Sequence, residues 1–138
     1  MGQKVRPTGF RIGIMEGWKS QWYAGKQDFS DLLIEDVKIR RFIVKYLTRR
    51  NQRGQRPGIS RIQIDRTREK VQVTLSSSRV GMIIGKKGEN IDKLTKELED
   101  LTHRHIEIKT VEVNRPETDP QLIAEDIAEQ LEKRSSFR

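Results

Sequence analysis

The stretch VGMIIGKKGENI, residues 80–91, restricts the possible folds more than any other part of the sequence. Glycines at positions 85 and 88 follow the apolar run Met82–Ile84, and two lysines lie between them. Because glycine tolerates left-handed backbone angles, it commonly ends helices. We therefore expect a short helix that ends at Gly85, a four-residue basic loop, and a second helix that begins near Gly88 or Glu89.

The spacing of apolar residues around this loop predicts a mixed α+β domain. Apolar and polar residues alternate along Ile59–Arg66 and again along Val71–Leu75, which is the period of a half-buried strand. The short turn Thr67–Lys70 between them favours an antiparallel hairpin. The predicted elements are, in order, a helix over Ser30–Thr48, strands over Ile59–Arg66 and Val71–Leu75, helices over Arg79–Ile84 and from Gly88 or Glu89 to Thr102, a strand over Ile106–Val113 and a helix over Pro120–Arg134.

Helical periodicity also predicts which side chains are buried and which cap the helices. Ser30 and Ser78 are expected to cap the first two helices, since a serine oxygen can accept a hydrogen bond from a first-turn amide. The residues expected on buried helix faces are Leu33, Val37, Ile39, Ile43, Val44, Tyr46 and Leu47 in the first helix, Ile91, Leu94, Leu98 and Leu101 in the helix after the loop, and Ile123, Ile127 and Leu131 in the last helix.

Residues 1–27 predict an irregular N-terminal arm, because they contain five glycines and no steady apolar period. Such a segment buries little surface alone, so it should either pack on the domain or become ordered on a partner. Trp18, Trp22 and Tyr23 fit two roles, stacking on unpaired bases or packing at the edge of the domain.

The basic charge of the chain is concentrated in one segment. The net charge is +8, which favours a polyanionic partner. Residues 38–70 contain twelve basic and two acidic side chains, and most of the basic ones are arginines, whose planar guanidinium groups match phosphate oxygens. The alternative is a solvated surface that only keeps the protein soluble, but such surfaces usually mix both signs of charge. The arginines of this segment that we predict to contact phosphates are Arg40, Arg41, Arg49, Arg50, Arg53 and Arg56.

The spacing of the glycines excludes two common phosphate-binding motifs. Counted from Gly81, a P-loop would need glycine at position 86, which is a lysine. A dinucleotide-binding motif would need a second glycine at position 83 and a preceding strand, but position 83 is isoleucine and the loop follows a helix. The sequence therefore supports neither an ATPase nor a dehydrogenase.

The loop instead has the features expected of a contact with a sugar-phosphate chain. The two glycines let a backbone approach closely, and the first amides of the following helix carry partial positive charge. The two lysines add full charges, and the isoleucines at 83 and 84 could form the wall of an apolar groove for unstacked bases. The predicted contacts are Arg79, Ile84, Gly85, Lys86, Lys87 and Gly88.

These features together resemble the K homology (KH) domain, in which a GxxG loop between two helices holds about four nucleotides of a single strand. Because glycine is common, a GxxG alone has little weight, and the order of the elements matters more. Two strands precede the helix pair and one follows it. This order, helix-strand-strand-helix-helix-strand, is similar to the type II arrangement, and the resemblance implies an α+β fold with a three-stranded sheet packed on helices.

The whole sequence resembles the bacterial-type family of ribosomal protein number three of the small subunit. The segments that carry the resemblance are MGQKVRPTGFRIGI, the WYA at Trp22–Ala24, Glu35-Asp36, Ile39-Arg40, GMIIGKKGENIDKL and PETDPQLIAEDIAEQLEKRSSFR. The resemblance implies three regions. These are an arm that binds ribosomal RNA over residues 1–27, a type II KH domain over 28–113, and a C-terminal helix over 114–138 that leads toward a second α+β domain not included in this sequence.

The resemblance further implies a structural constituent of the small subunit that binds ribosomal RNA in the head, near the channel where messenger RNA enters. Lys4, Arg6 and Arg11 of the arm would then contact phosphates. The implied partners are small-subunit ribosomal RNA, neighbouring proteins of the head and, as a further candidate, messenger RNA, and the implied location is the ribosome in the cytoplasm. Two departures are Val80, where the family usually has proline, and residues 51–57, which resemble an insertion.

Two other functions are weighed against this one. A free-standing KH protein that regulates through single-stranded RNA would lack the N-terminal arm. A nucleic-acid-processing enzyme would need a catalytic cluster, but His103 and His105 fit a surface turn better than a zinc site, and Glu97, Glu99 and Asp100 fit a solvated helix face. We expect no enzymatic activity, catalytic residue, metal site, cofactor, small-molecule substrate or membrane association.

Overall fold

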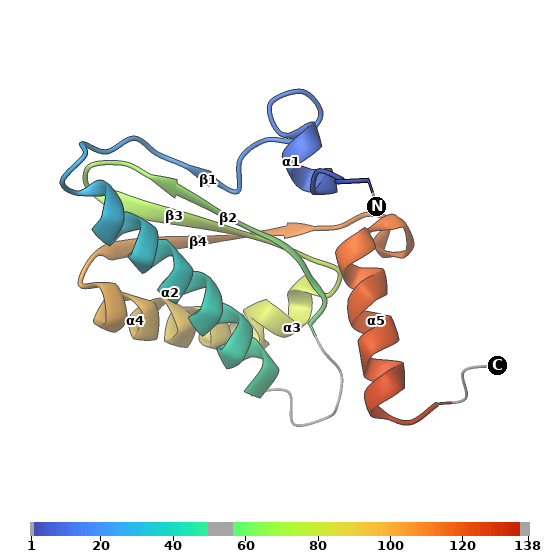
Figure 1. Ribbon diagram of the computed structural model, residues 1–138. Coiled ribbons are helices and arrows are strands. Elements are labelled where there is room, and N and C mark those ends of the chain that lie inside the picture. The colour runs from blue at the N-terminus through green and yellow to red at the C-terminus, as the bar shows by residue number, and fades with distance from the viewer. Residues whose placement is uncertain (1, 50–56, 136–138) are drawn as a thin grey trace.

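The computed structural model describes residues 2–49 and 57–135, and Figure 1 shows a twisted sheet with helices packed on one of its faces. The sheet has four strands in the order β1-β2-β3-β4. The predicted α+β class and the type II order of elements are confirmed. The elements are α1 (Pro7–Arg11), β1 (Ser20–Gln21), α2 (Phe29–Arg49), β2 (Ile59–Arg66), β3 (Lys70–Ser77), α3 (Val80–Ile84), a 3-10 turn at Lys86–Gly88, α4 (Glu89–Thr102), β4 (His105–Glu112), a second 3-10 turn at Pro116–Thr118 and α5 (Pro120–Glu132).

The predicted hairpin forms the centre of the sheet. β2 pairs with β3 in antiparallel register, with Ile64 opposite Val73, and the Thr67 amide donates to the Lys70 carbonyl at 3.0 Å to close the turn. β3 then pairs with β4 in parallel register, with Val73 opposite Ile108. Because side chains alternate across a strand, these apolar residues share the face that α2, α3 and α4 cover.

One apolar core lies between this face of the sheet and the helices. α2 contributes Ile39 and Ile43, α3 contributes Ile83, and α4 contributes Leu94 and Leu98, all at most 1% exposed. Burial of each such side chain contributes about 1.5–3 kcal/mol. α2 is amphipathic, and no helix in the described ranges is long and apolar enough to cross a membrane.

The prediction of a three-stranded sheet is wrong by one strand. Ser20 and Gln21, in the segment expected to be irregular, pair in parallel with Ile64 and Asp65 and so form β1 at the edge of the sheet. A strand of two residues is too short to show an alternating pattern in the sequence. The arm also contains α1, whose proline at the first helical position is a common way to begin a helix.

The burial predictions for α2 are correct for only one of its two apolar stripes. Ile39, Ile43 and Leu47 are buried, whereas Leu33, Val37 and Val44 are 47%, 39% and 49% exposed. The helix has apolar residues on two faces, and periodicity cannot tell which face meets the sheet. The buried face also contains Asp36, a position that hydrophobic periodicity would assign to the surface.

In the last two helices, too, the observed burial of apolar side chains differs from the predicted burial. In α4, Leu94 and Leu98 are buried as predicted, but Leu101 is 40% exposed. In α5, the predicted stripe of Ile123, Ile127 and Leu131 is 42%, 53% and 49% exposed, and Leu122 is the buried residue instead. α5 stands beside the end of the sheet in Figure 1, so only a small part of its surface meets the domain.

Two predicted helix caps are also wrong. Ser30 lies inside α2, which begins at Phe29. α3 begins at Val80 with Arg79 as its N-cap residue, and no described side chain caps it. The Ser77 hydroxyl accepts from the Arg79 amide at 3.0 Å, just before the helix. The same Ser77 hydroxyl donates to the Pro57 carbonyl at 2.6 Å, so it links the start of α3 to the segment before β2.

Candidate nucleic-acid interface

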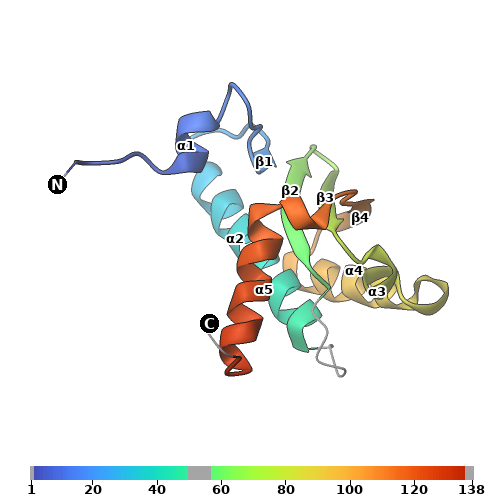
Figure 2. The ribbon, with the colours of Figure 1, turned by 90° about the vertical axis from the view of Figure 1, so that its right-hand side faces the viewer.

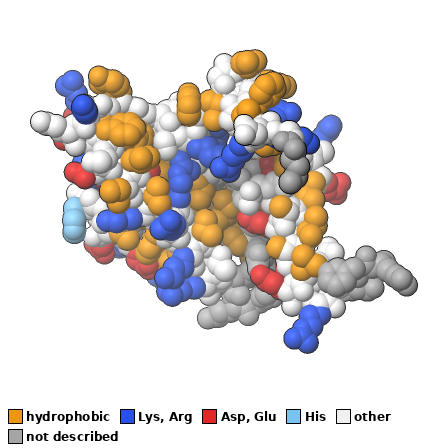
Figure 3. Space-filling view, viewed as in Figure 1, with side chains coloured by type: hydrophobic (Ala, Val, Ile, Leu, Met, Phe, Trp, Pro, Cys, Tyr) orange, Lys and Arg blue, Asp and Glu red, His pale blue; other side chains and the backbone are white. Residues whose placement is uncertain are grey.

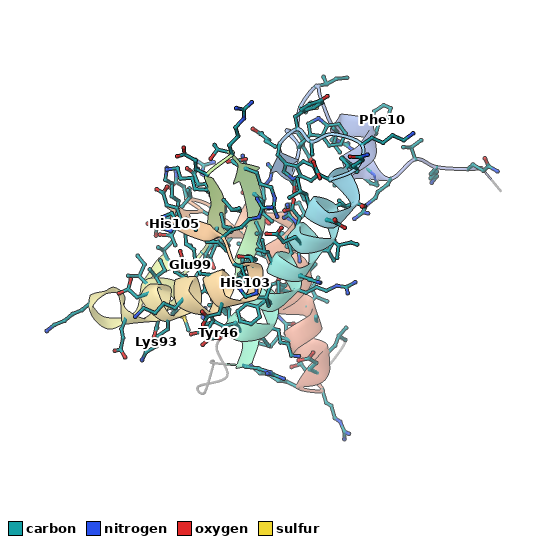
Figure 4. The ribbon with its side chains drawn as sticks, turned by 90° about the vertical axis from the view of Figure 1, so that its left-hand side faces the viewer. Phe10, Tyr46, Lys93, Glu99, His103 and His105 are labelled. Atoms are coloured by element: carbon teal, nitrogen blue, oxygen red, sulfur yellow. The ribbon has the colours of Figure 1, made fainter. Side chains whose placement is uncertain are left out.

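The glycine loop is a left-handed turn between α3 and α4. The Gly85 amide donates to the Gly81 carbonyl at 3.0 Å and ends α3, and Gly85 has φ of 73°. Lys87 has φ of 55° and Gly88 has φ of 83°. The loop lies at the tip of the α3–α4 pair and projects from the body of the molecule (Figure 4).

The two glycines have different surroundings. A Cβ at Gly85 would lie 2.2 Å from Nδ2 of Asn90, so the space beside this glycine is already occupied by a side chain of α4. A Cβ at Gly88 would meet nothing within 4 Å. The open surface through which a sugar-phosphate chain could approach the loop therefore lies at Gly88, while Gly85 is needed for packing within the loop.

The first turn of α4 begins beside this open surface. Gly88 is the N-cap residue, and no described side chain caps the helix there. The amide groups at a helix N-terminus carry partial positive charge and favour an anion. Lys87 is exposed next to them, whereas the Lys86 side chain lies outside the described part of the structure.

The other predicted residues of this region divide between the core and the surface. Ile83 is 1% exposed and belongs to the core, so it does not form the wall of a groove as the sequence suggested. Ile84 is half-buried beside the loop, and Arg79 is exposed at the start of α3.

Arg40 was predicted to contact phosphate, but its guanidinium faces the protein. Nη2 donates to the Lys19 carbonyl at 2.6 Å and to the Ser20 hydroxyl at 2.7 Å, and Nη1 donates to the Ile62 carbonyl. Burial lowers the pKa of Arg40, and the nearby Asp36 carboxylate partly offsets this effect. Arg40 therefore joins the arm to β2 and α2.

Arg41 and Arg49 lie on the exposed face of α2, together with Lys38 and Lys45. No acidic residue occurs in α2 after Asp36, so this basic face of α2 carries one sign of charge. A shallow hollow of about 460 Å³ lies on this face, and its lining includes Arg41, Lys45 and Arg49 together with Val44. Figure 3 shows Lys and Arg side chains around apolar ones on this side of the molecule. The remaining predicted arginines, Arg50, Arg53 and Arg56, lie outside the described residues.

Lys4, Arg6 and Arg11 are exposed on the arm, and Arg11 Nη1 donates to the Pro7 carbonyl at 3.1 Å. Figures 2 and 4 show α1 and the glycine loop at opposite ends of the molecule. Apart from Arg40 and the three arginines outside the described residues, the predicted residues fall into three places, which are the loop, the basic face of α2 and the arm. The structure does not bring the loop and the arm together.

A buried polar network that the sequence did not predict lies at the base of the arm. Trp22 Nε1 donates to Oδ2 of Asp36 at 2.8 Å, and Arg66 Nε donates to Oδ1 at 2.8 Å. The Trp22 ring also packs on Phe29, with ring centroids 5.2 Å apart. Of the two roles open for Trp22, the structure supports packing, whereas Trp18 and Tyr23 are 63% and 96% exposed. One sequence signal could have revealed this network, because Asp36 shares the helical spacing of Ile39 and Ile43 on the buried face of α2.

The histidines form part of a surface turn between α4 and β4, where Figure 4 labels them. His103 has a left-handed backbone and its amide donates to the Glu99 carbonyl at 2.7 Å, which ends α4. Oε1 of Glu99 accepts from the Ile106 amide at 3.1 Å and lies 2.8 Å from Nδ1 of His105. These contacts lower the pKa of Glu99, the amide contributing most. Across the described residues, no three His, Cys, Asp or Glu side chains are grouped as metal ligands.

Comparison with known proteins gives a match that agrees with the fold and covers the glycine loop. The family model of the KH domain matches residues 38–118, a range that includes the sheet hairpin, the loop and β4. Relatives named small ribosomal subunit protein uS3 match the whole chain, with 55% identity in Rhodopirellula baltica, 49% in Desulforudis audaxviator and 47% in Pelagibacter ubique. The chain spans 58%, 60% and 58% of the length of these relatives.

The resemblance expected from the sequence is thus confirmed over all 138 residues. The KH match covers more than half of the chain and agrees with the observed order of strands and helices around the GKKG loop. This chain belongs to the KH domain family.

Proposed function

We propose that this chain is the RNA-binding part of a structural protein of the small ribosomal subunit. The observation that carries the proposal is its 55% identity with uS3 of Rhodopirellula baltica over all 138 residues, a match that spans the arm, the glycine loop and α5. The proposed role is binding and structural, and it includes no enzymatic step. The proposed location is the ribosome.

The glycine loop is proposed to hold a single-stranded segment of RNA. A phosphate would approach the open surface at Gly88 and meet the first amides of α4, with Lys87 supplying a full charge beside them. The half-buried Ile84 would lie against an unstacked base, and Arg79 would contact the strand from the start of α3.

The basic face of α2 and the arm are proposed to bind the phosphates of folded ribosomal RNA. Arg41 and Arg49 are exposed on a face without acids, which suits a polyanion. Lys4, Arg6 and Arg11 extend this contact at the other end of the molecule from the loop. Arg50, Arg53 and Arg56 remain predicted contacts from the sequence, while we assign Arg40 a structural role in place of its predicted phosphate contact.

Several finer parts of the proposal rest on the likeness to uS3 alone. They are a position in the head of the small subunit near the channel where messenger RNA enters, contact with neighbouring head proteins, and messenger RNA as a further candidate partner. The region boundaries 1–27, 28–113 and 114–138 likewise stay predictions.

Co-sedimentation tests the proposal. The chain is mixed with small-subunit particles assembled without uS3, and we expect it to pellet with them at a one-to-one ratio. The double variant Lys86→Asp with Lys87→Asp should bind single-stranded RNA more weakly and keep its circular dichroism spectrum. A matched control, Lys26→Asp with Lys96→Asp, makes the same charge change at two exposed positions outside the proposed contacts and should bind normally.

The alternative is a free-standing KH protein that regulates through single-stranded RNA. Under that alternative the chain binds single strands through the loop but does not pellet with small subunits. Unchanged RNA affinity in a folded Lys86→Asp, Lys87→Asp variant would contradict the role of the loop in both cases.

A further inference from the structure

Asp36 is a buried carboxylate at the point where three segments meet. It is 2% exposed, and both of its oxygens have partners. Oδ2 accepts from Trp22 of the arm, and Oδ1 accepts from Nε and Nη2 of Arg66 on β2, each at 2.8 Å or less. The carboxylate itself belongs to α2, so one side chain connects the arm, the longest helix and the sheet.

Further charged groups surround this junction. Nη1 of Arg66 lies 3.2 Å from Oε1 of Glu35, and Nε of Arg104 lies 3.7 Å from Oε2 of the same glutamate. The Arg66 side chain is 5% exposed, so this ion pair is shielded from water. Buried charges persist only when they are paired, and removal of one partner leaves the other without compensation. Loss of one member of this junction would therefore destabilise it.

The arm is fastened to the domain at its base and is exposed beyond it. The Lys19 carbonyl accepts from the Ile64 amide at 3.0 Å, and the Gly17 carbonyl accepts from Arg61 Nη2 at 2.7 Å. Arg40 adds the contacts to Lys19 and Ser20 described above. Most of residues 2–16, including the basic side chains, is exposed.

We propose that Trp22, Asp36 and Arg66 are positioning residues for RNA binding. None of them contacts RNA. They fix the base of the arm so that Lys4, Arg6 and Arg11 stand at a set distance from the glycine loop before RNA arrives. The inference rests on the proposed function, because it requires that the arm contact RNA. An arm held in place loses less conformational entropy when it binds, which raises affinity without adding a contact.

The variant Trp22→Phe separates the arm from this junction with little change to the core. It removes the indole N–H but keeps an aromatic ring to pack on Phe29, and it leaves the pair of Asp36 and Arg66 intact. We expect a melting temperature lowered by several degrees, because Oδ2 of the buried Asp36 loses its donor. We also expect faster amide exchange at residues 17–21, and affinity for a small-subunit ribosomal RNA fragment reduced about tenfold, the effect of ordering one further backbone residue on binding. Trp18→Phe is the matched control, since the Trp18 ring is 63% exposed, and it should leave exchange and affinity unchanged.

The same substitution in a full-length chain with Lys4→Gln, Arg6→Gln and Arg11→Gln completes the test. If the junction acts through the basic side chains of the arm, Trp22→Phe has no further effect on affinity once those charges are removed. If the triple replacement itself leaves affinity unchanged, the proposed RNA contact of the arm is wrong, and the positioning role fails with it. If the triple replacement weakens binding but Trp22→Phe does not, the positioning role alone is overturned.

A second variant covers the case in which Trp22→Phe does not fold. Arg61→Lys keeps the positive charge but loses the guanidinium fork that reaches the Gly17 carbonyl. It should also speed amide exchange at residues 17–21 and weaken RNA binding, though by less than tenfold because Arg40 still holds the Lys19 carbonyl. Faster exchange at residues 17–21 with normal affinity would overturn the positioning role, because a loosened arm base would then not weaken RNA binding.

Discussion

Replacement of the two loop glycines one at a time should separate a structural position from a binding position. Gly85 has φ of 73° and ψ of −171°, a backbone region that almost only glycine occupies. Gly88 has φ of 83° and ψ of 0°, a left-handed conformation that other residues adopt at a cost. A Cβ at Gly85 would also lie 2.2 Å from Asn90 Nδ2, whereas a Cβ at Gly88 has open space.

These observations set the expected magnitudes. In Gly85→Ala, the backbone strain costs about 1–3 kcal/mol, and displacement of the Asn90 side chain costs about 1–3 kcal/mol more. In Gly88→Ala, the left-handed backbone alone costs about 1–2 kcal/mol. We therefore expect Gly85→Ala to lose about 2 kcal/mol more free energy of unfolding than Gly88→Ala, which urea denaturation followed by circular dichroism can measure.

RNA binding should follow the opposite order. Gly88→Ala places a methyl group on the open surface beside the first amides of α4, and loss of one charge-assisted hydrogen bond there corresponds to an affinity about tenfold lower. Adding Asn90→Ala to Gly85→Ala should restore only part of the stability lost to the steric clash, because the Cβ of residue 90 would still lie 2.9 Å from the new methyl group. Equal destabilisation by the two glycine variants, or normal RNA affinity in folded Gly88→Ala, would refute this assignment of roles.

Three further perturbations test other parts of the structure. Arg41→Gln with Arg49→Gln should flatten the slope of log K against log salt concentration by about 1.4–1.8 if each arginine contacts one phosphate, and an unaltered slope would indicate a merely solvated face. Asp36→Ala should lower the free energy of unfolding by about 3–5 kcal/mol, because Arg66 stays buried without its partner; a loss below about 1 kcal/mol would show that the ion pair is not needed. The folded-state pKa of Glu99 is lowered from 4.5, so its stabilising contribution is present at neutral pH and is lost as the pH falls below 4.5. Glu99→Gln should therefore show a shallower loss of stability in acid, and a steeper one would contradict the contact with Ile106.

The glycine loop and the order of elements could be predicted because both depend on local signals. Alternation predicted the hairpin at Ile59–Leu75, and glycines at 85 and 88 predicted the break between α3 and α4. These signals arise from backbone preferences of the residues themselves, so they do not depend on what packs nearby.

The faces of the helices could not be predicted in the same way. α2 has apolar residues on two sides, and only the packing against the sheet decides that Ile39 is buried while Val37 is 39% exposed. α5 has a regular apolar stripe at Ile123, Ile127 and Leu131, but its buried residue is Leu122, and its N-cap Asp119 accepts from the Ser60 hydroxyl of β2. Tertiary contacts, not periodicity, determine burial in both helices.

The roles of the arginines were the hardest part of the candidate site to predict. Arg40, Arg41 and Arg66 belong to the same basic segment, yet one holds the arm, one is exposed and one is buried against Asp36. Composition shows how much positive charge a segment carries, but only the three-dimensional contacts show which guanidinium groups are free to meet a phosphate.

Crosslinking of RNA to protein in reconstituted small subunits tests the central claim most directly. After ultraviolet irradiation and digestion, peptides bound to nucleotides are identified by mass spectrometry. We predict crosslinks in residues 79–88 of the loop region and in residues 4–11 of the arm, at the two ends of the molecule shown in Figure 2. Crosslinks confined to the polar outer face of the sheet, around Gln72 and Lys109, with none in the loop or the arm, would contradict the account.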